Sequence, residues 1–206
     1  MPTITADKEM RDFFLHKLQE KSAPIRTEIH VSDLTYCLRK AFWRRTKNRQ
    51  LSEQQLIFFL DGHQCHEGIQ NLCKNLKHEV EIRRYGIAGH LDLMDKHPVE
   101  IKTTHARPNG TKPAHYLRQG AYYCLITGSG TFSLITQYIN DGTLTFETIK
   151  FTKEELDEYL KDMLFDRDLL QKAYDDQDVA LLGFPSDDWQ CRHCEFQTDC
   201  YPKKGC

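Results

Sequence analysis

Apolar residues in the first third of the chain recur every three or four positions, the spacing of one face of an α-helix. A first helix is predicted for residues 6–20, with Thr5 as its N-cap, and four apolar residues share its face: Met10, Phe13, Phe14 and Leu18. The segment VSDLTYCLRKAFWRR, residues 31–45, is predicted to form a second helix capped by Ser32. A third helix is predicted over about residues 53–77. The N-terminal third is therefore expected to be helical.

The pattern changes from helical spacing to alternation in HEVEIRRYGIAGHLDLMDKHPVEIKTT, residues 78–104. β-Branched residues are frequent there, and a turn is indicated between Asp95 and Pro98, so this segment is expected to form adjoining strands. Alternation returns in TFSLITQYI and LTFETIKF, and the NDGT between them is a strong turn signal. These two segments are therefore predicted to form a hairpin.

Two more helices are predicted around this hairpin. AHYLRQGAYYCLITG has helical spacing and ends at Gly128, and Thr152 with Glu155 forms a capping box that opens a helix running to about Ala173. Helices that alternate with strands indicate an α/β fold with a mixed central sheet flanked by helices. The expected organisation is an N-terminal helical region, a core, and a cysteine-rich tail: residues 1–52, 53–180 and 181–206.

Composition narrows the class of protein. The chain has 206 residues, of which 39% are hydrophobic and 28% charged, with a net charge of -2, which is typical of a soluble globular domain. No stretch approaches the roughly 18 consecutive apolar residues of a membrane span, and the start MPTITADKEM lacks the order of a signal peptide. We therefore expect a cytoplasmic protein with no membrane partner. In a reducing compartment its eight cysteines favour thiolates and metals over disulfides.

Positive charge is concentrated in one segment, residues 39–49, which contains no acid. Its six cations are Arg39, Lys40, Arg44, Arg45, Lys47 and Arg49. Such a run indicates either a phosphate-binding surface or the solvated face of a helix. Phe42 and Trp43 within it are candidates for stacking on bases, with packing in the core as the alternative.

In GHLDLMDKHPVEIKTT, three charged residues lie in the strand-like parts on either side of the turn: Asp92, Glu100 and Lys102. Glu100 and Lys102 share one face of their strand because side chains alternate, and the turn near Lys96 brings Asp92 toward Glu100. Convergent carboxylates repel unless a cation lies between them, and such oxygen ligands suit Mg²⁺ or Mn²⁺. Lys102 is then placed to hold and polarise a metal-bound water. The alternative is a solvent-facing pair of strands with a surface Glu–Lys contact.

Gly89-His90-Leu91-Asp92 followed by Glu100-Ile101-Lys102 resembles the core motif of the RecB-like branch of the PD-(D/E)XK nucleases, with Leu91 where a proline often precedes the aspartate. Two further motifs follow the family's order, Gly62-x-x-x-His66 upstream and Gln119-x-x-x-Tyr123 downstream. An ordinary polar histidine and a packing tyrosine are the alternatives for these two motifs.

This resemblance implies a restriction-endonuclease-like core over residues 53–180 that hydrolyses DNA with Mn²⁺ or Mg²⁺. It implies a set of metal ligands: His66, Asp92, Glu100 and the backbone carbonyl of Ile101. It also implies a set of catalytic residues: Asp92, Glu100, Lys102, Gln119 and Tyr123.

The tail carries a C-x2-C-x5-C motif, and one more cysteine lies far upstream, so four thiolates can join the N-terminal region to the tail: Cys37, Cys191, Cys194 and Cys200. Four thiolates suit Zn²⁺ or an iron–sulfur cluster, and buried thiols are the alternative. The one-plus-three arrangement resembles the iron–sulfur-containing RecB-like nucleases, which implies a 4Fe-4S cluster. Cys65, Cys73 and Cys124 are expected in the core, and Cys206 is a possible substitute for Cys200.

Small size and this order of motifs resemble the fourth CRISPR-associated protein family, a set of stand-alone exonucleases. That resemblance implies trimming of single-stranded DNA ends during spacer acquisition, with the CRISPR integrase proteins as partners. Four cations beside Cys37 would then contact DNA phosphates: Arg39, Lys40, Arg44 and Arg45. The alternatives are a free-standing or phage-encoded repair nuclease, a catalytically silent DNA-binding adaptor, and a zinc-stapled structural protein.

Overall fold

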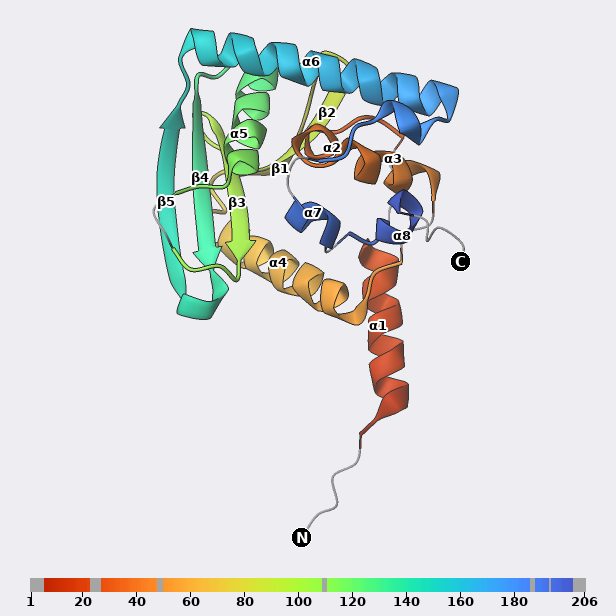
Figure 1. Ribbon diagram of the computed structural model, residues 1–206. Helices are drawn as coiled ribbons and strands as arrows, with labels where there is room; N and C mark the ends of the chain where they lie inside the picture. Colours follow the sequence, from red (N-terminus) through yellow and green to blue (C-terminus); the bar gives the residue numbers. More distant parts are fainter. Residues whose placement is uncertain are drawn as a thin grey trace.

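A mixed five-stranded sheet forms the centre of the computed structural model, which describes residues 6–22, 27–47, 50–108, 111–185, 188–192 and 194–201 (Figure 1). Its strands are β1 (Lys77–Arg84), β2 (Ile87–Met94), β3 (Pro98–Thr104), β4 (Thr131–Tyr138) and β5 (Thr143–Lys150). The spatial order is β1-β2-β3-β4-β5, and only β3 and β4 pair in parallel. That parallel step requires a crossover, which α5 (Ala114–Thr127) supplies.

Helices cover both faces of the sheet. The other helices of eight residues or more are α1 (Lys8–Ser22), α3 (Leu38–Thr46), α4 (Glu53–Leu72) and α6 (Lys153–Asp176), and the short ones are α2 (Val31–Thr35), α7 (Asp188–Arg192) and α8 (Gln197–Cys200). Alternate residues of β4 pack on opposite sides: Leu134 joins the core under α5 and α6, and Ile135 joins the smaller core under α4. The predicted α/β architecture is confirmed.

Local signals in the sequence account for several element ends. The Ser52 and Thr152 side chains accept hydrogen bonds from the backbone of Gln55 and Glu155, so each opens its helix with a capping box. Gly128 ends α5 in the left-handed conformation, with φ of 77°, which glycine adopts without steric cost. The turn between β2 and β3 and the β4–β5 hairpin also lie where the sequence predicts them.

The single helix predicted for residues 31–45 is wrong. The chain forms α2 and α3 instead, with Tyr36 extended between them, and the N-cap of α2 is His30 rather than Ser32. His30 pairs with Ala88 in an isolated bridge to the sheet, and Val31 and Leu34 are fully buried. Docking on the sheet therefore fixes the direction of α2, and the break turns α3 to face the tail.

Two other helical predictions need correction. The helix predicted to reach residue 77 ends at Leu72, because β1 starts at Lys77. On α1 only Leu18 of the four apolar residues is buried, while Met10, Phe13 and Phe14 are exposed. This helix packs against α4 and projects from the body of the molecule (Figure 1). Thr5, Arg49 and Cys206 lie outside the described residues.

Candidate active site and cysteine cluster

The hairpin formed by β2 and β3 opens at Asp92. Near the turn the two strands pair regularly, Met94 with Pro98 and Leu93 with Val99. One step further, the Ile101 N–H donates to Asp92 Oδ2 at 2.7 Å. The side-chain carboxylate thus takes the place of a backbone acceptor on the neighbouring strand. The opening leaves room for other groups between the strands.

Glu100 and Lys102 lie beside this opening and contact each other. Lys102 Nζ is 2.6 Å from Glu100 Oε1, and both side chains are largely buried, with 17% and 6% of their surfaces exposed for the lysine and the glutamate. Gln119 Nε2 donates to the same oxygen at 2.7 Å. Glu100 Oε2, in contrast, is buried and has no hydrogen-bond partner among the described residues. Burying a carboxylate oxygen without a partner lowers the stability of the fold unless a cation or a water molecule binds to it.

Helix α5 connects this carboxylate to the backbone of β2. Gln119 and Tyr123 are one helical turn apart, and Gln119 Nε2 donates to the Tyr123 hydroxyl at 3.0 Å. That hydroxyl donates in turn to the carbonyl oxygen of His90 at 2.9 Å. Gly89 allows the tyrosine to approach, since a Cβ there would lie 3.1 Å from its ring. The structure thus brings the QxxxY residues to Glu100.

Helix α4 brings His66 to the same place. His66 Nδ1 lies 3.2 Å from Asp92 Oδ1, so the two oxygens of Asp92 contact two different elements. Burial opposes protonation of His66 and so lowers its pKa. The hydrogen bond to Asp92 and the negative charge of the Asp92 carboxylate outweigh this effect and raise the pKa of the imidazole. His66, Asp92, Glu100 and Lys102 therefore form one interacting set of charges.

The electrostatics of the pair favour a bound cation. Burial raises the pKa of Glu100, and the Lys102 ammonium only partly opposes that rise. Burial lowers the pKa of Lys102, but the neighbouring Glu100 more than compensates and raises it. Lys102 therefore keeps its charge, whereas Glu100 needs nearby positive charge to remain ionised.

The donor types here fit Mg²⁺ or Mn²⁺: two carboxylates, an imidazole and a backbone oxygen. The Ile101 N–H points toward β2, and in a strand the carbonyl of a residue points to the same side as its N–H. Regular pairing between β2 and β3 does not extend to Ile101, so its carbonyl oxygen is directed into the open part of the hairpin. As the side chains stand, however, no three His, Cys, Asp or Glu in the described ranges are arranged to hold a metal ion. Glu100 would have to exchange part of its contact with Lys102 for the ion.

Four cysteines line one cavity: Cys37 at the start of α3, Cys191 in α7, Cys194 between α7 and α8, and Cys200 in α8. None of the described cysteines is in a disulfide. Cys200 Sγ accepts a hydrogen bond from the Trp43 indole at 3.3 Å, and Cys194 Sγ accepts one from the backbone N–H of Phe196 at 3.4 Å. Burial raises the pKa of the Cys37 and Cys194 thiols, an effect that a bound metal would reverse. Thiolates are the ligand type of zinc sites and iron–sulfur clusters, but as the side chains stand no three of the described cysteines are arranged to hold a metal ion.

The cations predicted to contact DNA point in different directions. Lys40 and Arg44 both contact the Glu195 carboxylate, at 2.9 and 3.4 Å. Arg39 donates to the carbonyl of Leu182 and lies over the ring of Phe184, and Arg45 lies over Tyr174. Only Lys40 and Arg44 therefore form a common charged surface within this set.

Of the two aromatic residues in the basic segment, neither is placed for base stacking. Phe42 is buried and stacks on Tyr174, and the Trp43 indole is committed to Cys200. Sequence reasoning missed two other aromatics, Tyr36 and Trp189, which line a pocket beside Lys40 and Arg44. Their positions next to the predicted cysteine ligands could have identified them, because Tyr36 directly precedes Cys37 and Trp189 lies two residues before Cys191.

No helix in the described part of the chain is long and apolar enough to cross a membrane.

No known family matches the chain, and no curated protein is a significant relative. Among solved structures it is similar to SSO0001, with a TM-score of 0.68 and 22% identity over 95% of this chain and 98% of that one. It is also similar to LHK-Exo in complex with dAMP, with a TM-score of 0.51 and 13% identity over 81% and 95%. LHK-Exo is an alkaline exonuclease from Laribacter hongkongensis. At these identities the likeness concerns the fold: the chain shares with SSO0001 and with this exonuclease a mixed sheet flanked by helices.

Proposed function

We propose that the chain is a metal-dependent deoxyribonuclease that hydrolyses phosphodiester bonds at the ends of single-stranded DNA. The observation that carries the proposal is the buried Glu100–Lys102 pair, held by Gln119 and placed beside Asp92. Buried charges with perturbed pKa values cluster at functional sites, because burying them otherwise costs stability. The fold shared with an exonuclease supports the same reading.

Each residue has a separate task in this proposal. Asp92, Glu100, His66 and the carbonyl of Ile101 would hold Mg²⁺ or Mn²⁺. When bound, such an ion supplies positive charge at the scissile phosphate and lowers the pKa of a coordinated water. Lys102 orients the attacking water and stabilises negative charge as it develops on the phosphate.

Gln119 and Tyr123 do not reach the substrate in this scheme. Gln119 orients the Glu100 carboxylate, and Tyr123 holds Gln119 against the backbone of His90. They are positioning residues, which fix the geometry that the reacting groups require.

The four cysteines are proposed to hold a 4Fe-4S cluster, with structural Zn²⁺ as the alternative. Either would join α3 in the region 1–52 to the tail 181–206 and hold both beside the core 53–180. The cavity that all four cysteines line supports this role.

For the biological setting, we propose the trimming of DNA ends during CRISPR spacer acquisition, with the integrase proteins of that system as partners. A free-standing or phage-encoded repair nuclease would use the same residues. A silent DNA-binding adaptor is the third alternative, although such proteins tend to lose one of the charged residues that this chain retains: Asp92, Glu100 and Lys102.

The decisive test is the substitution Lys102→Ala. We expect turnover on single-stranded DNA to fall by about 100-fold or more, the scale of losing a positioned catalytic group, while DNA binding and metal binding persist. Asp92→Ala and Glu100→Ala should lose metal affinity as well, measured by titration calorimetry. Lys172→Ala, an exposed lysine on α6, is the matched control. Parent-like digestion by all three site variants would refute the proposed active site.

A further inference from the structure

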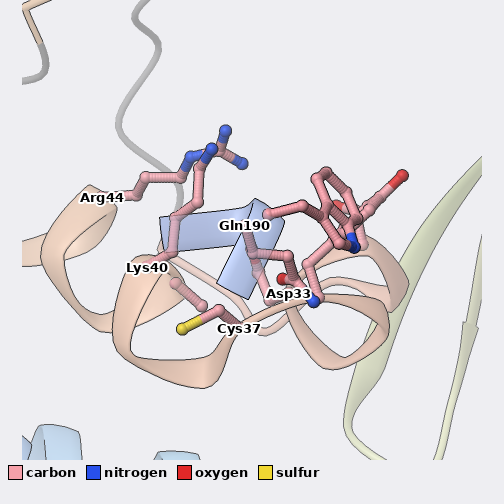
Figure 2. A pocket seen from close by; sticks show the side chains of 9 residues that line it. Asp33, Cys37, Lys40, Arg44 and Gln190 are labelled. Atoms are coloured by element: carbon pink, nitrogen blue, oxygen red, sulfur yellow. The ribbon is translucent and has the colours of Figure 1, made fainter. Parts of the chain in front are cut away.

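A pocket of about 290 Å³ lies where α2, α3 and α7 meet, outside the set of charges around Glu100 (Figure 2). Tyr36, Lys40 and Arg44 line it from the N-terminal region, and Trp189 and Gln190 line it from the tail. Its volume is at the lower end of small-molecule sites, which span roughly 300 to 1,000 Å³. One nucleotide unit fits this size better than a folded segment of a partner does.

The lining combines cations with aromatic rings. Figure 2 shows Lys40 and Arg44 extending together from α3. Both contact the buried carboxylate of Glu195. The Asp33 carboxylate, which accepts a hydrogen bond from the His30 N–H, also lines the pocket, so Lys40 and Arg44 offer a phosphate hydrogen-bond donors rather than an excess of positive charge. Trp189 retains 41% of its surface exposed, so its ring is available to a ligand. Cations that contact phosphates, together with rings that stack on bases, are the two components of single-strand binding sites.

Aromatic contacts connect the pocket to Lys102. The Lys102 ammonium lies 5.7 Å from the centre of the Tyr116 ring, and that ring is 4.7 Å from His115. His115 in turn lies 5.1 Å from Tyr36 and 5.4 Å from Trp189, measured between ring centres. Three steps, one from the ammonium to a ring and two between rings, therefore separate the proposed catalytic lysine from the rings that line the pocket.

We propose that this pocket is a subsite that holds one nucleotide of single-stranded DNA next to the reacting phosphodiester, with its base against Trp189 and Tyr36 and its phosphate on Lys40 and Arg44. The inference rests on the proposed nuclease function and extends it. Stacking tolerates any base and phosphate contacts carry no sequence information, so the subsite selects a flexible single strand without reading its sequence. A duplex end would have to unpair before a base enters.

The test measures binding without cleavage. The probe is a fluorescein-labelled single-stranded trinucleotide with phosphorothioate linkages, in Ca²⁺, titrated by fluorescence anisotropy. Trp189→Ala should weaken binding by about tenfold, the scale of losing one stacked base, and Trp189→Phe should restore most of it. Arg44→Gln should make the dependence of log affinity on log salt shallower by about 0.7, the value for one phosphate contact on a single strand.

Controls separate a built subsite from a general surface effect. Phe165→Ala removes an exposed ring on α6, and Lys172→Gln removes one exposed charge there, so both should bind like the parent. An abasic trinucleotide should bind the parent and Trp189→Ala equally well. The subsite would be overturned if Trp189→Ala and Arg44→Gln both bound the trinucleotide as tightly as the parent. It would also be overturned if Trp189→Ala lost as much affinity for the abasic probe as for the ordinary one.

The two proposals fail in distinguishable ways. Trp189-dependent binding by a parent protein that cleaves no DNA under any metal would refute the nuclease and keep the subsite. Cleavage of DNA with unaltered trinucleotide binding in Trp189→Ala would refute the subsite and keep the nuclease. Circular dichroism melts of each variant verify that the fold is intact, which is expected for Trp189 because it lies outside the buried core.

Discussion

Each oxygen of the Asp92 carboxylate contacts a different element. Oδ2 accepts from the backbone of Ile101 in β3, and Oδ1 lies against His66 of α4. One carboxylate thereby determines where the hairpin opens and which helix faces the opening. Asparagine could keep the first contact but would remove the charge that raises the pKa of His66.

We expect His66→Ala to change the metal preference of the proposed nuclease. An imidazole nitrogen added to oxygen ligands favours Mn²⁺, which accepts mixed ligands, over Mg²⁺, which prefers oxygen alone. The parent should therefore be inactive in EDTA and recover with Mn²⁺ at least as well as with Mg²⁺. Initial rates across both metals should show that the variant loses the manganese advantage. An unaltered rate and preference in His66→Ala would remove it from the ligand set.

We expect Tyr123→Phe to act through Gln119 and Glu100. The substitution removes the donor to the His90 carbonyl and the acceptor for Gln119, and unpaired buried groups cost about 1–3 kcal/mol. Urea denaturation should show this loss, and turnover should fall while Km for DNA stays the same, because the groups that bind DNA are untouched. Tyr159→Phe on α6 is the control. A loss of stability with full turnover would assign Tyr123 a purely structural role.

At the scale of elements, the position of α5 decides whether the site forms. This helix carries Gln119 and Tyr123 toward β2 and β3 on one side and rests on β4 at Gly120. A Cβ at Gly120 would lie 2.5 Å from the Phe132 ring, closer than atoms can approach. The glycine is therefore needed for the close contact between helix and sheet.

We expect Gly120→Ala to destabilise the protein by about 1–2 kcal/mol, because overpacking outweighs the gain in helix propensity. Gly68→Ala on α4 is the matched control, since a Cβ there meets nothing within 4 Å. That control should gain up to about 1 kcal/mol. Urea denaturation of both variants measures the two effects, and equal stabilisation by both substitutions would contradict the close contact.

At the scale of the whole molecule, segments from the two ends of the chain meet around the four cysteines. Cys37 also lines the pocket that contains Trp189, so the sulfur cavity and the proposed nucleotide subsite share a wall. Cys191 is two residues from Trp189 in α7. Ligation of the tail would therefore fix the tryptophan beside α3.

If the four cysteines hold the proposed 4Fe-4S cluster, the parent protein should be brown, and Cys37→Ser and Cys194→Ser should lose that colour and lower the melting temperature together. The unfolded chain has no preformed site, so binding of a cluster is coupled to folding. Visible absorption and thermal melts of anaerobically purified protein measure both effects. Cys73→Ser, which packs against the smaller core, should stay brown. Stoichiometric zinc without iron in the parent would refute the cluster and keep the four-sulfur site.

The sequence by itself determined the features that depend on neighbours in the chain. Alternation marked the strands around Asp92 and Glu100, and helical spacing placed Gln119 and Tyr123 on one face. The capping box of Thr152 with Glu155 and the helix-ending Gly128 marked helix ends, because these signals act within one turn. The family-like order of the motifs selected the same residues that lie together around Glu100 in the folded chain.

Only the tertiary structure decided the features that depend on distant partners. The predicted helix starts at the bridge between His30 and Ala88 and breaks at Tyr36, although helical spacing continues through the break. Glu195 lies far from Lys40 in the sequence, and their contact requires the tail to reach α3. Tyr36 and Trp189 meet at one pocket for the same reason. The periodicity of apolar residues indicates which face of a helix or strand is buried. Which residues the other face contacts depends on how the elements pack together, and local sequence does not encode that.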